Sequence, residues 1–241
     1  MNAGRWPVGA GTSEKDGTLH VRTRKSPNTR PRVLVSLAQD EPKVSRNADS
    51  IRDRLKNGAK LVVVNTGAET IDLTDKDLVG SGQDWTLRIT GTSSVRIHLT
   101  TPLPANAQIV ATDTSFVEAT GHVTGHAYTR VTGHAFDQCT VHARNHAVVS
   151  VCDWASALAV DDAVISAYDT ARVNASGRAQ VTAGDSTSVH LSESARASVC
   201  RGVRVTGPAR ANLHASRSAG RSQQAAHGRC TQRARGPLRS R

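Results

Sequence analysis

Hydrophobic residues recur along the middle of the chain with a spacing of eight. In gapless blocks of eight (octads) from Ile109, the first position is mostly Val or Ile, the third is mostly Ala, and the seventh is small or apolar. Every eighth residue from Val63 to Val199, the third column, is apolar. Apolar and polar residues alternate within each octad, as on a strand with one buried face, whereas a helix would rotate them off a single stripe. The pattern predicts strands of about five residues, from the seventh position to the next third.

The fifth position of the octad predicts a turn between consecutive strands. It is mostly Asp, Asn or Gly from Asp113 to Asp185, and these residues tolerate left-handed backbone geometry or accept bonds from backbone donors. Strand–turn units with no room for crossover helices predict a parallel β-solenoid. Coils of two or three octads both fit. We favour two, a 16-residue coil, because inward Ala lets two sheets approach closely, and 61–204 would then form nine coils. Large residues early in this region predict a taper: Trp85, Leu87, Ile89, Val95, Ile97 and Leu99.

The segment before the repeats predicts an N-terminal cap. Arg32–Leu37 is typical of a strand, and residues from about Ser45 to Asn57 predict a short helix with Ile51 and Leu55 inward and Gly58 after its end. The expected fold is therefore all-β, a parallel β-solenoid (β-helix) with a short α-helical cap. We expect disorder in 1–31, a strand–helix cap in 32–60, the solenoid in 61–204 and a disordered Arg-rich tail in 205–241.

The charge of the chain is concentrated at its C-terminal end. The net charge of +11 arises from 31 Lys and Arg against 20 Asp and Glu, and no acidic residue follows Glu193. Eleven arginines after that point carry the whole excess: Arg196, Arg201, Arg204, Arg210, Arg217, Arg221, Arg229, Arg233, Arg235, Arg239 and Arg241. Such a tail can bind nucleic acid through phosphate contacts, or it can serve only to solubilise the chain.

Two outward columns contain candidate ligands for a cation. In a two-octad coil Asp137, Asp153, Asp169 and Asp185 would stack along one edge, whereas a three-octad coil would stack Asp113, Asp137, Asp161 and Asp185. These carboxylates would form a cation ladder or accept backbone hydrogen bonds in their own turns, and we favour the second. His126 and His142 would be neighbours on one face, with His134 opposite. A surface zinc or nickel site is the functional interpretation, and solvated histidines are the favoured one. Tyr128, Phe136, Trp154 and Tyr168 are also expected outside.

No sequence motif indicates catalysis. G-x-S-x-G, H-E-x-x-H, Walker A and Rossmann fingerprints are absent, and no C-x-x-C pair indicates a zinc or redox site. We therefore expect no enzymatic activity and no cofactor. The sequence contains no apolar segment typical of a signal peptide or a membrane span, so a cytoplasmic location is expected by default.

The gapless octapeptide with small inward residues resembles the repeats of bacterial ice-nucleation proteins and octad-repeat proteins of bacteria and their phages. The resemblance covers about 61–204 and lies in the period and the alternation. It implies a solenoid and, as a weaker alternative, ice binding through rows of outward Thr. Here Thr124, Thr132 and Thr140 occupy one column, which continues as Val148, Ser156 and Val164.

Two classes of function follow from the sequence. The first is a structural or surface-binding solenoid, such as a rigid spacer, an appendage or an assembly component, with possible end-to-end self-association. The second is a nucleic-acid-associated protein that binds through its Arg-rich tail. Cation binding is a weaker alternative, and the particular partner is unknown from the sequence.

The tail hypothesis predicts salt-dependent binding to duplex DNA. If the tail binds phosphates, the full chain will bind DNA at low salt, the affinity will fall as salt is added, and a 1–204 truncation will lose it. Fluorescence anisotropy over a salt series measures this. Failure of the full chain to bind at low salt would remove the hypothesis.

Overall fold

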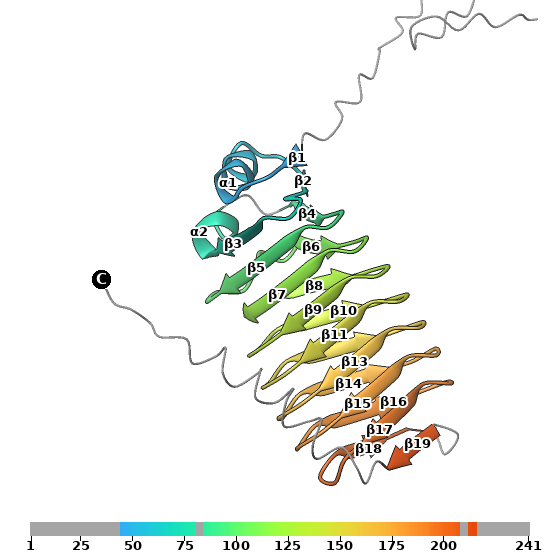
Figure 1. The fold of residues 1–241 in the computed structure, drawn as a ribbon. Helices are drawn as coiled ribbons and strands as arrows, with labels where there is room; N and C mark the ends of the chain where they lie inside the picture. The colour runs from blue at the N-terminus through green and yellow to red at the C-terminus, as the bar shows by residue number, and fades with distance from the viewer. Residues whose placement is uncertain (1–43, 81–83, 208–211, 216–241) are drawn as a thin grey trace, which may run out of the picture. The chain divides into compact units, whose positions relative to one another are not determined.

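The computed structural model describes residues 44–80, 84–207 and 212–215, the last four by their backbone only. These residues form two parallel β-sheets that face each other, and the chain alternates between them strand by strand (Figure 1). The fold is thus a parallel β-solenoid with a small helical cap, and the predicted fold class is confirmed. The predicted strand at Arg32–Leu37 lies outside the described residues.

Each coil contributes one strand to each sheet. Sheet A contains, in spatial order, β1 (Val44–Ser45), β2 (Leu61–Val64), β4 (Thr86–Ile89), β6 (Gln108–Ala111), β8 (Thr124–Ala127), β10 (Thr140–Ala143), β12 (Ser156–Ala159), β14 (Arg172–Ala175), β16 (Ser188–Leu191) and β18 (Arg204–Thr206). Sheet B contains β3 (Thr70–Thr74), β5 (Ser94–Leu99), β7 (Phe116–Gly121), β9 (Thr132–Ala135), β11 (Val148–Val151), β13 (Val164–Ala167), β15 (Gln180–Ala183), β17 (Arg196–Val199) and β19 (Asn212–Ala215).

The register fixes the coil at two octads from β6 onward. His142 lies opposite His126 in sheet A, and Ser150 lies opposite His134 in sheet B. Successive strands begin one octad apart from Gln108 to Arg204. Most of them run only from the eighth position to the next third, so they are one residue shorter than predicted.

The first two coils are longer, so the gapless spacing predicted before Ile109 is wrong. Leu61 lies opposite Thr86, and Thr86 lies opposite Gln108, so both of these coils exceed two octads. A short helix and a loop account for the additional length. Three of the predicted inward residues are therefore not buried in strands. Val63 lies between the buried Val62 and Val64, Val79 ends the helix, and Leu103 lies in the loop.

These longer coils also change the number of coils in 61–204. This range holds eight complete coils rather than nine, and β18 and β19 form a ninth coil that continues to Ala215. The ninth coil therefore includes residues that the sequence had assigned to the tail.

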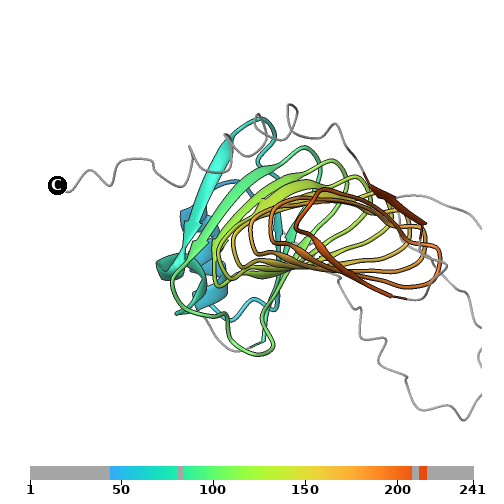
Figure 2. The same ribbon diagram turned by 90° about the horizontal axis from the view of Figure 1, so that it is seen from below.

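The core is a narrow apolar layer between the two sheets. The third-column residues from Ala111 to Val199 are all buried, and most of them are Ala. Wider coils near the N-terminus accommodate Trp85, Leu87, Ile89, Val95, Ile97 and Leu99, all of which are buried. Seen along the axis, the coils narrow toward the C-terminal end, as the residue sizes predicted (Figure 2).

Left-handed turns at the fifth position join the sheets. Asp137, Asp153, Asp169 and Asp185 have φ between 56° and 59°, and Gly177 occupies the same conformation at the other edge with φ 66°. A residue with a Cβ is disfavoured in this region, and Asp and Asn are the tolerated side-chain types. The conformation explains why the fifth position is mostly Asp, Asn or Gly.

Two helices close the N-terminal end. Helix α1 (Ala48–Lys56) begins where the Asn47 side chain accepts a bond from Ser50 N, and its Ile51 and Leu55 are buried as predicted. Helix α2 (Asp75–Leu78) follows β3 and packs against α1.

One buried carboxylate connects the two helices. The side chain of Asp77 is 1% exposed, and it accepts bonds from Arg52 Nε (2.9 Å) and Arg52 Nη2 (2.6 Å) and from Thr74 N and Oγ1 (both 2.9 Å). Burial raises the pKa of Asp77, but the bonds from Thr74 and Arg52 outweigh it and hold the pKa below its usual value. Asp49, also paired with Arg52, is 80% exposed.

Removal of Asp77 should loosen the cap. Replacing it by Ala leaves the Arg52 guanidinium without its buried partner, and we expect a loss of about 2–4 kcal/mol in unfolding free energy in urea titrations. The control Asp49→Ala removes the exposed partner and should cost less than about 0.5 kcal/mol.

The pH dependence follows from the lowered pKa of Asp77. Its contribution is present in full above the unfolded-state value of 3.8 and is lost as the pH falls through the lower folded-state value. The difference between wild type and Asp77→Ala should therefore be constant near neutral pH and shrink only below about pH 4. Equal losses for both substitutions would contradict this account of the cap.

Candidate functional site

The two-octad coil brings the four candidate aspartates together along one edge. Asp137, Asp153, Asp169 and Asp185 occur once per coil, in the turns that lead from sheet B to sheet A. The backbone N–H of each of the first three donates to the Asp carboxylate one coil further on, at 3.3–3.4 Å. The favoured interpretation had placed these bonds within each turn. Instead they cross from one coil to the next.

The opposite edge repeats the same arrangement with other residue types. Asn145 N donates to Asp161 Oδ2 at 3.4 Å, and Gly177 N donates to Glu193 Oε2 at 2.8 Å. Since the residue on the donor side can be Asp, Asn or Gly, these contacts require a left-handed backbone at the donor and a carboxylate only at the acceptor. Within the described residues, no group of three or more His, Cys, Asp or Glu lies close enough to hold a metal ion. The row of aspartates thus links each coil to the next through hydrogen bonds from backbone N–H groups to carboxylates.

His126 and His142 are neighbours on sheet A, and their rings are tilted relative to each other. The ring centroids are 4.7 Å apart at an interplanar angle of 36°, and His126 stacks on Tyr128 at 6.1 Å and 9°. His126 Nδ1 is buried without a hydrogen-bond partner. Burial lowers the pKa of His126, and the neighbouring His142 and Arg144 lower it further. A neutral His126 ring that stacks on Tyr128 contributes packing to the face of sheet A.

His134 lies on the other face, as the sequence predicted. It is in β9 of sheet B, where its ring meets Phe116 edge-on at 5.6 Å and stacks with Phe136 at 6.3 Å. Each sheet thus has a small cluster of His and aromatic rings over the same coils. Trp154 is 72% exposed, but Tyr168, expected outside, is buried at 8% exposure.

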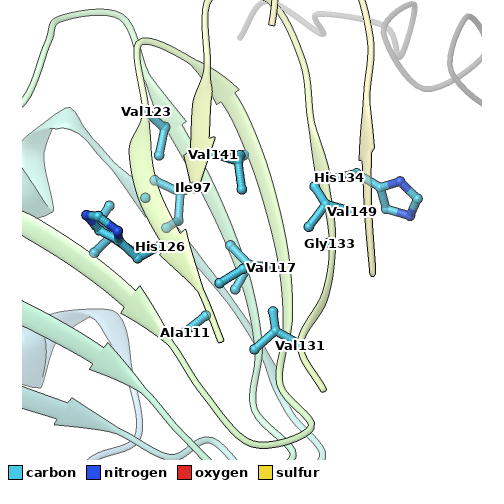
Figure 3. Close-up of a pocket in the computed structure, with 14 residues that line it drawn as sticks. Ile97, Ala111, Val117, Val123, His126, Val131, Gly133, His134, Val141 and Val149 are labelled. Carbon is cyan, nitrogen blue, oxygen red and sulfur yellow. The ribbon is translucent and has the colours of Figure 1, made fainter. Parts of the chain in front are cut away.

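A small cavity lies inside the solenoid between these two clusters. It measures about 40 Å³ and is lined by inward apolar residues of both sheets, with Gly125 and Gly133 in the first column, where most other octads have Val or Ile. In Figure 3, His126 and His134 point away from it on opposite sides. An apolar space of this size, little more than the volume of one water molecule, is a packing defect and not a ligand pocket.

Three of the candidate arginines belong to the last coils. Arg196, Arg201 and Arg204 are exposed there, while the other eight candidates lie outside the described residues. Arg178, earlier in the solenoid, is paired with Asp162 at 2.6 Å. The described candidate arginines therefore gather at one end of the solenoid.

The sequence analysis missed Asp75 and Asp77. Both oxygens of Asp75 accept bonds from the backbone and hydroxyl groups of Thr100 and Thr101, which ties the long loop of the second coil to α2. Burial raises the pKa of Asp75, but these bonds outweigh it and hold the pKa well below its usual range. The spacing Thr74-x-x-Asp77 is a capping-box signal and could have revealed the helix start.

Comparison with known proteins gives no relative for this chain. No family model, no curated protein and no solved structure matches it. In the part of the chain that the structure describes, no helix has the length and apolar character needed to cross a membrane.

Substitutions at Asp153 separate the conformational role of the ladder from its charge. If the turn requires a left-handed residue, Asp153→Ala will cost about 1 kcal/mol more unfolding free energy than Asp153→Gly, because both lose the acceptor for Asp137 N and only Ala is disfavoured in this conformation. Asp153→Asn keeps an acceptor oxygen and will cost less than about 0.5 kcal/mol. Urea titrations at low and high salt measure these values. If like-charge repulsion dominated the ladder instead, Asp153→Asn would be more stable than wild type at low salt and the gain would vanish in high salt.

Proposed function

We propose that this protein is a non-catalytic structural or surface-binding β-solenoid that serves as a rigid spacer or an assembly component. The observation that carries the proposal is the unbroken in-register stacking of β6 to β17. Every coil there has the same length, and equally short turns join the strands from β8 onward. Such a unit presents straight faces and few sites where a long loop could build a catalytic pocket.

The outer faces support a role in contact rather than chemistry. Outward residues of β9, β11, β13 and β15 in sheet B are uncharged: Thr132, His134, Val148, Ser150, Val164, Ser166, Gln180 and Thr182. Rows of small polar and β-branched side chains at about 4.8 Å spacing form a flat surface. Thr124 and Thr140 adjoin on sheet A, but the next residue in their row is Ser156, so the Thr row that ice binding would favour is short.

Nucleic-acid binding through the tail remains the second candidate. The acid-free sequence from Arg196 to Arg241 favours it, and the exposed Arg196, Arg201 and Arg204 would extend the basic segment onto the solenoid. Since β19 ends at Ala215, a truncation that spares the solenoid would end there rather than at residue 204.

The spacer proposal predicts one fixed distance per pair of sites along the axis. Arg96 and Ser198 belong to the same outward row of sheet B and are six strand spacings apart, which gives about 29 Å between their Cα atoms. Spin labels attached at these two positions through an unnatural amino acid should give a narrow distance distribution in pulsed electron–electron double resonance.

Glu118 and Thr182 provide the matched pair, four spacings or about 19 Å apart in the same row. A rigid unit keeps both distributions narrow and their mean distances in proportion to the number of strands. Broad distributions for both pairs would overturn the proposal.

A further inference from the structure

At the C-terminal end of the solenoid, the last described strand of each sheet has one edge without a partner strand among the described residues. β18 is the last strand of sheet A and β19 is the last strand of sheet B, and within the described residues each pairs with only one neighbour, β16 and β17 respectively. Arg204 N donates to Thr187 O at 2.9 Å. Hydrogen-bonding groups alternate sides along a parallel strand, so the N–H and C=O of Val205 point away from β16. An edge of this kind is a template for another strand.

Within the described residues, the apolar interior is also less covered at this end than one coil earlier. Val203 and Val205 are half-buried, whereas Thr187 and Val189, in the same columns one coil earlier, are 0% and 1% exposed. Figure 2 looks onto this end of the solenoid. Covering the end would therefore bury apolar side chains as well as pair the backbone.

The other end of the solenoid is closed by its own helices. Ile51 and Leu55 of α1 and Leu78 of α2 are buried against the first coil, and α1 contacts both β2 and β3. The outermost strands at that end, β1 and β3, also pair with one neighbour each within the described residues, but α1 contacts both of them. The two ends thus differ, since helices lie against the outermost strands at one end and no described helix lies against β18 or β19.

The apolar columns of the octad do not continue after the ninth coil. Continuing the octad beyond Ala215 would place Arg221 first and Gln223 third, in columns that are apolar in the solenoid core. An inward charge without a partner is costly. The apolar segment Arg32–Leu37 cannot reach, because the chain from Leu37 to Val44 spans at most about 25 Å, and the nine coils extend over about 38 Å.

We propose that the C-terminal end binds the same end of a second copy, with β18 pairing antiparallel to its counterpart and β19 to its own. The inference rests on the proposed function as an assembly component and names its partner. A two-fold contact uses one surface twice and closes as a dimer, whereas a head-to-tail filament would have to seat β18 and β19 on the end that α1 and α2 cover. The dimer continues both sheets and buries Val203 and Val205 of both copies.

The positive charge of this end makes dimer formation depend on the salt concentration. Arg196, Arg201 and Arg204 are exposed around it, so two ends repel each other at low ionic strength. Added salt screens the repulsion and strengthens the pairing, since the backbone bonds and apolar contacts are much less affected. DNA binding through arginines has the opposite salt dependence.

Sedimentation velocity on the full chain tests the pairing, over a concentration series and from about 50 mM to about 1 M salt. The expected result is an equilibrium between the 25.5 kDa chain and a species of twice that mass, with the dimer favoured by salt. Val205→Lys places a charge inward at the edge, and Val205→Pro removes the outward-pointing N–H that the second strand needs. Each should raise the dissociation constant at least about tenfold.

Thr182→Lys is the matched control, because it adds the same charge to an exposed outward position on β15. It should leave the dissociation constant unchanged, and circular dichroism checks that all variants keep their strands. A wild type that stays monomeric at every salt concentration would overturn the inference, as would species that grow beyond the dimer or a control as weak as Val205→Lys. A monomer that still gives narrow label-to-label distances refutes the end pairing alone and leaves the spacer proposal intact.

Discussion

From Asp113 to Glu193, the coils depend on a left-handed residue at the fifth position of each octad. A short strand must reverse and enter the other sheet within the same octad, and the φ near +60° at this position, as at Asp169 (59°), allows it. Asp, Asn and Gly reach this conformation at low cost. Because the turn never lengthens after β8, each strand falls in register with the strand two octads earlier. Backbone pairing, the apolar layer and the edge ladders all follow from that register.

The small inward Ala residues of the third column are also required by the short turns. Two sheets joined by such short turns are close together, and Ala143, Ala159 and Ala175 fill the space between them without forcing the turns apart. In the first two coils the residues are larger and the turns are replaced by α2 and a loop. Wide coils and long connections thus occur together, and so do narrow coils and short turns. The low aromatic content of 3% is a consequence of this narrow interior.

The sequence predicted the solenoid and its two-octad coil, because side-chain alternation and turn chemistry repeat without interruption after Ile109. The predicted register was wrong before that point. Apolar residues still occur there at every eighth position, but the strands do not pair at that spacing. Val79 fits the column, yet it ends a helix whose start was encoded locally by Thr74 and Asp77. Bonds between coils were also beyond the pattern. The carboxylate of Asp153 reaches Asp137 N, which depends on the rotamer and the coil offset as well as on residue type.

The candidate sites illustrate the difference between juxtaposition and chemistry. The coil places His126 beside His142 and stacks four aspartates, as the spacing predicted for two octads per coil. Yet the aspartates accept bonds from backbone donors and His126 stacks on Tyr128 beside the tilted His142 ring, so both sets stabilise the surface on which they lie. The charge of the chain is likewise regional, since the described candidate arginines lie on the last coils near the open end. The faces and the ends therefore carry the proposed function.

Nuclear Overhauser contacts between backbone protons test the register most directly. In a deuterated, amide-protonated sample, strands of the solenoid should give contacts between positions two octads apart throughout 108–206, as between His134 and Ser150. Between β2, β4 and β6, the longer pairings of Leu61 with Thr86 and of Thr86 with Gln108 should replace them. Contacts across three octads after Gln108, or antiparallel contacts between consecutive strands, would contradict the two-sheet coil and everything derived from it.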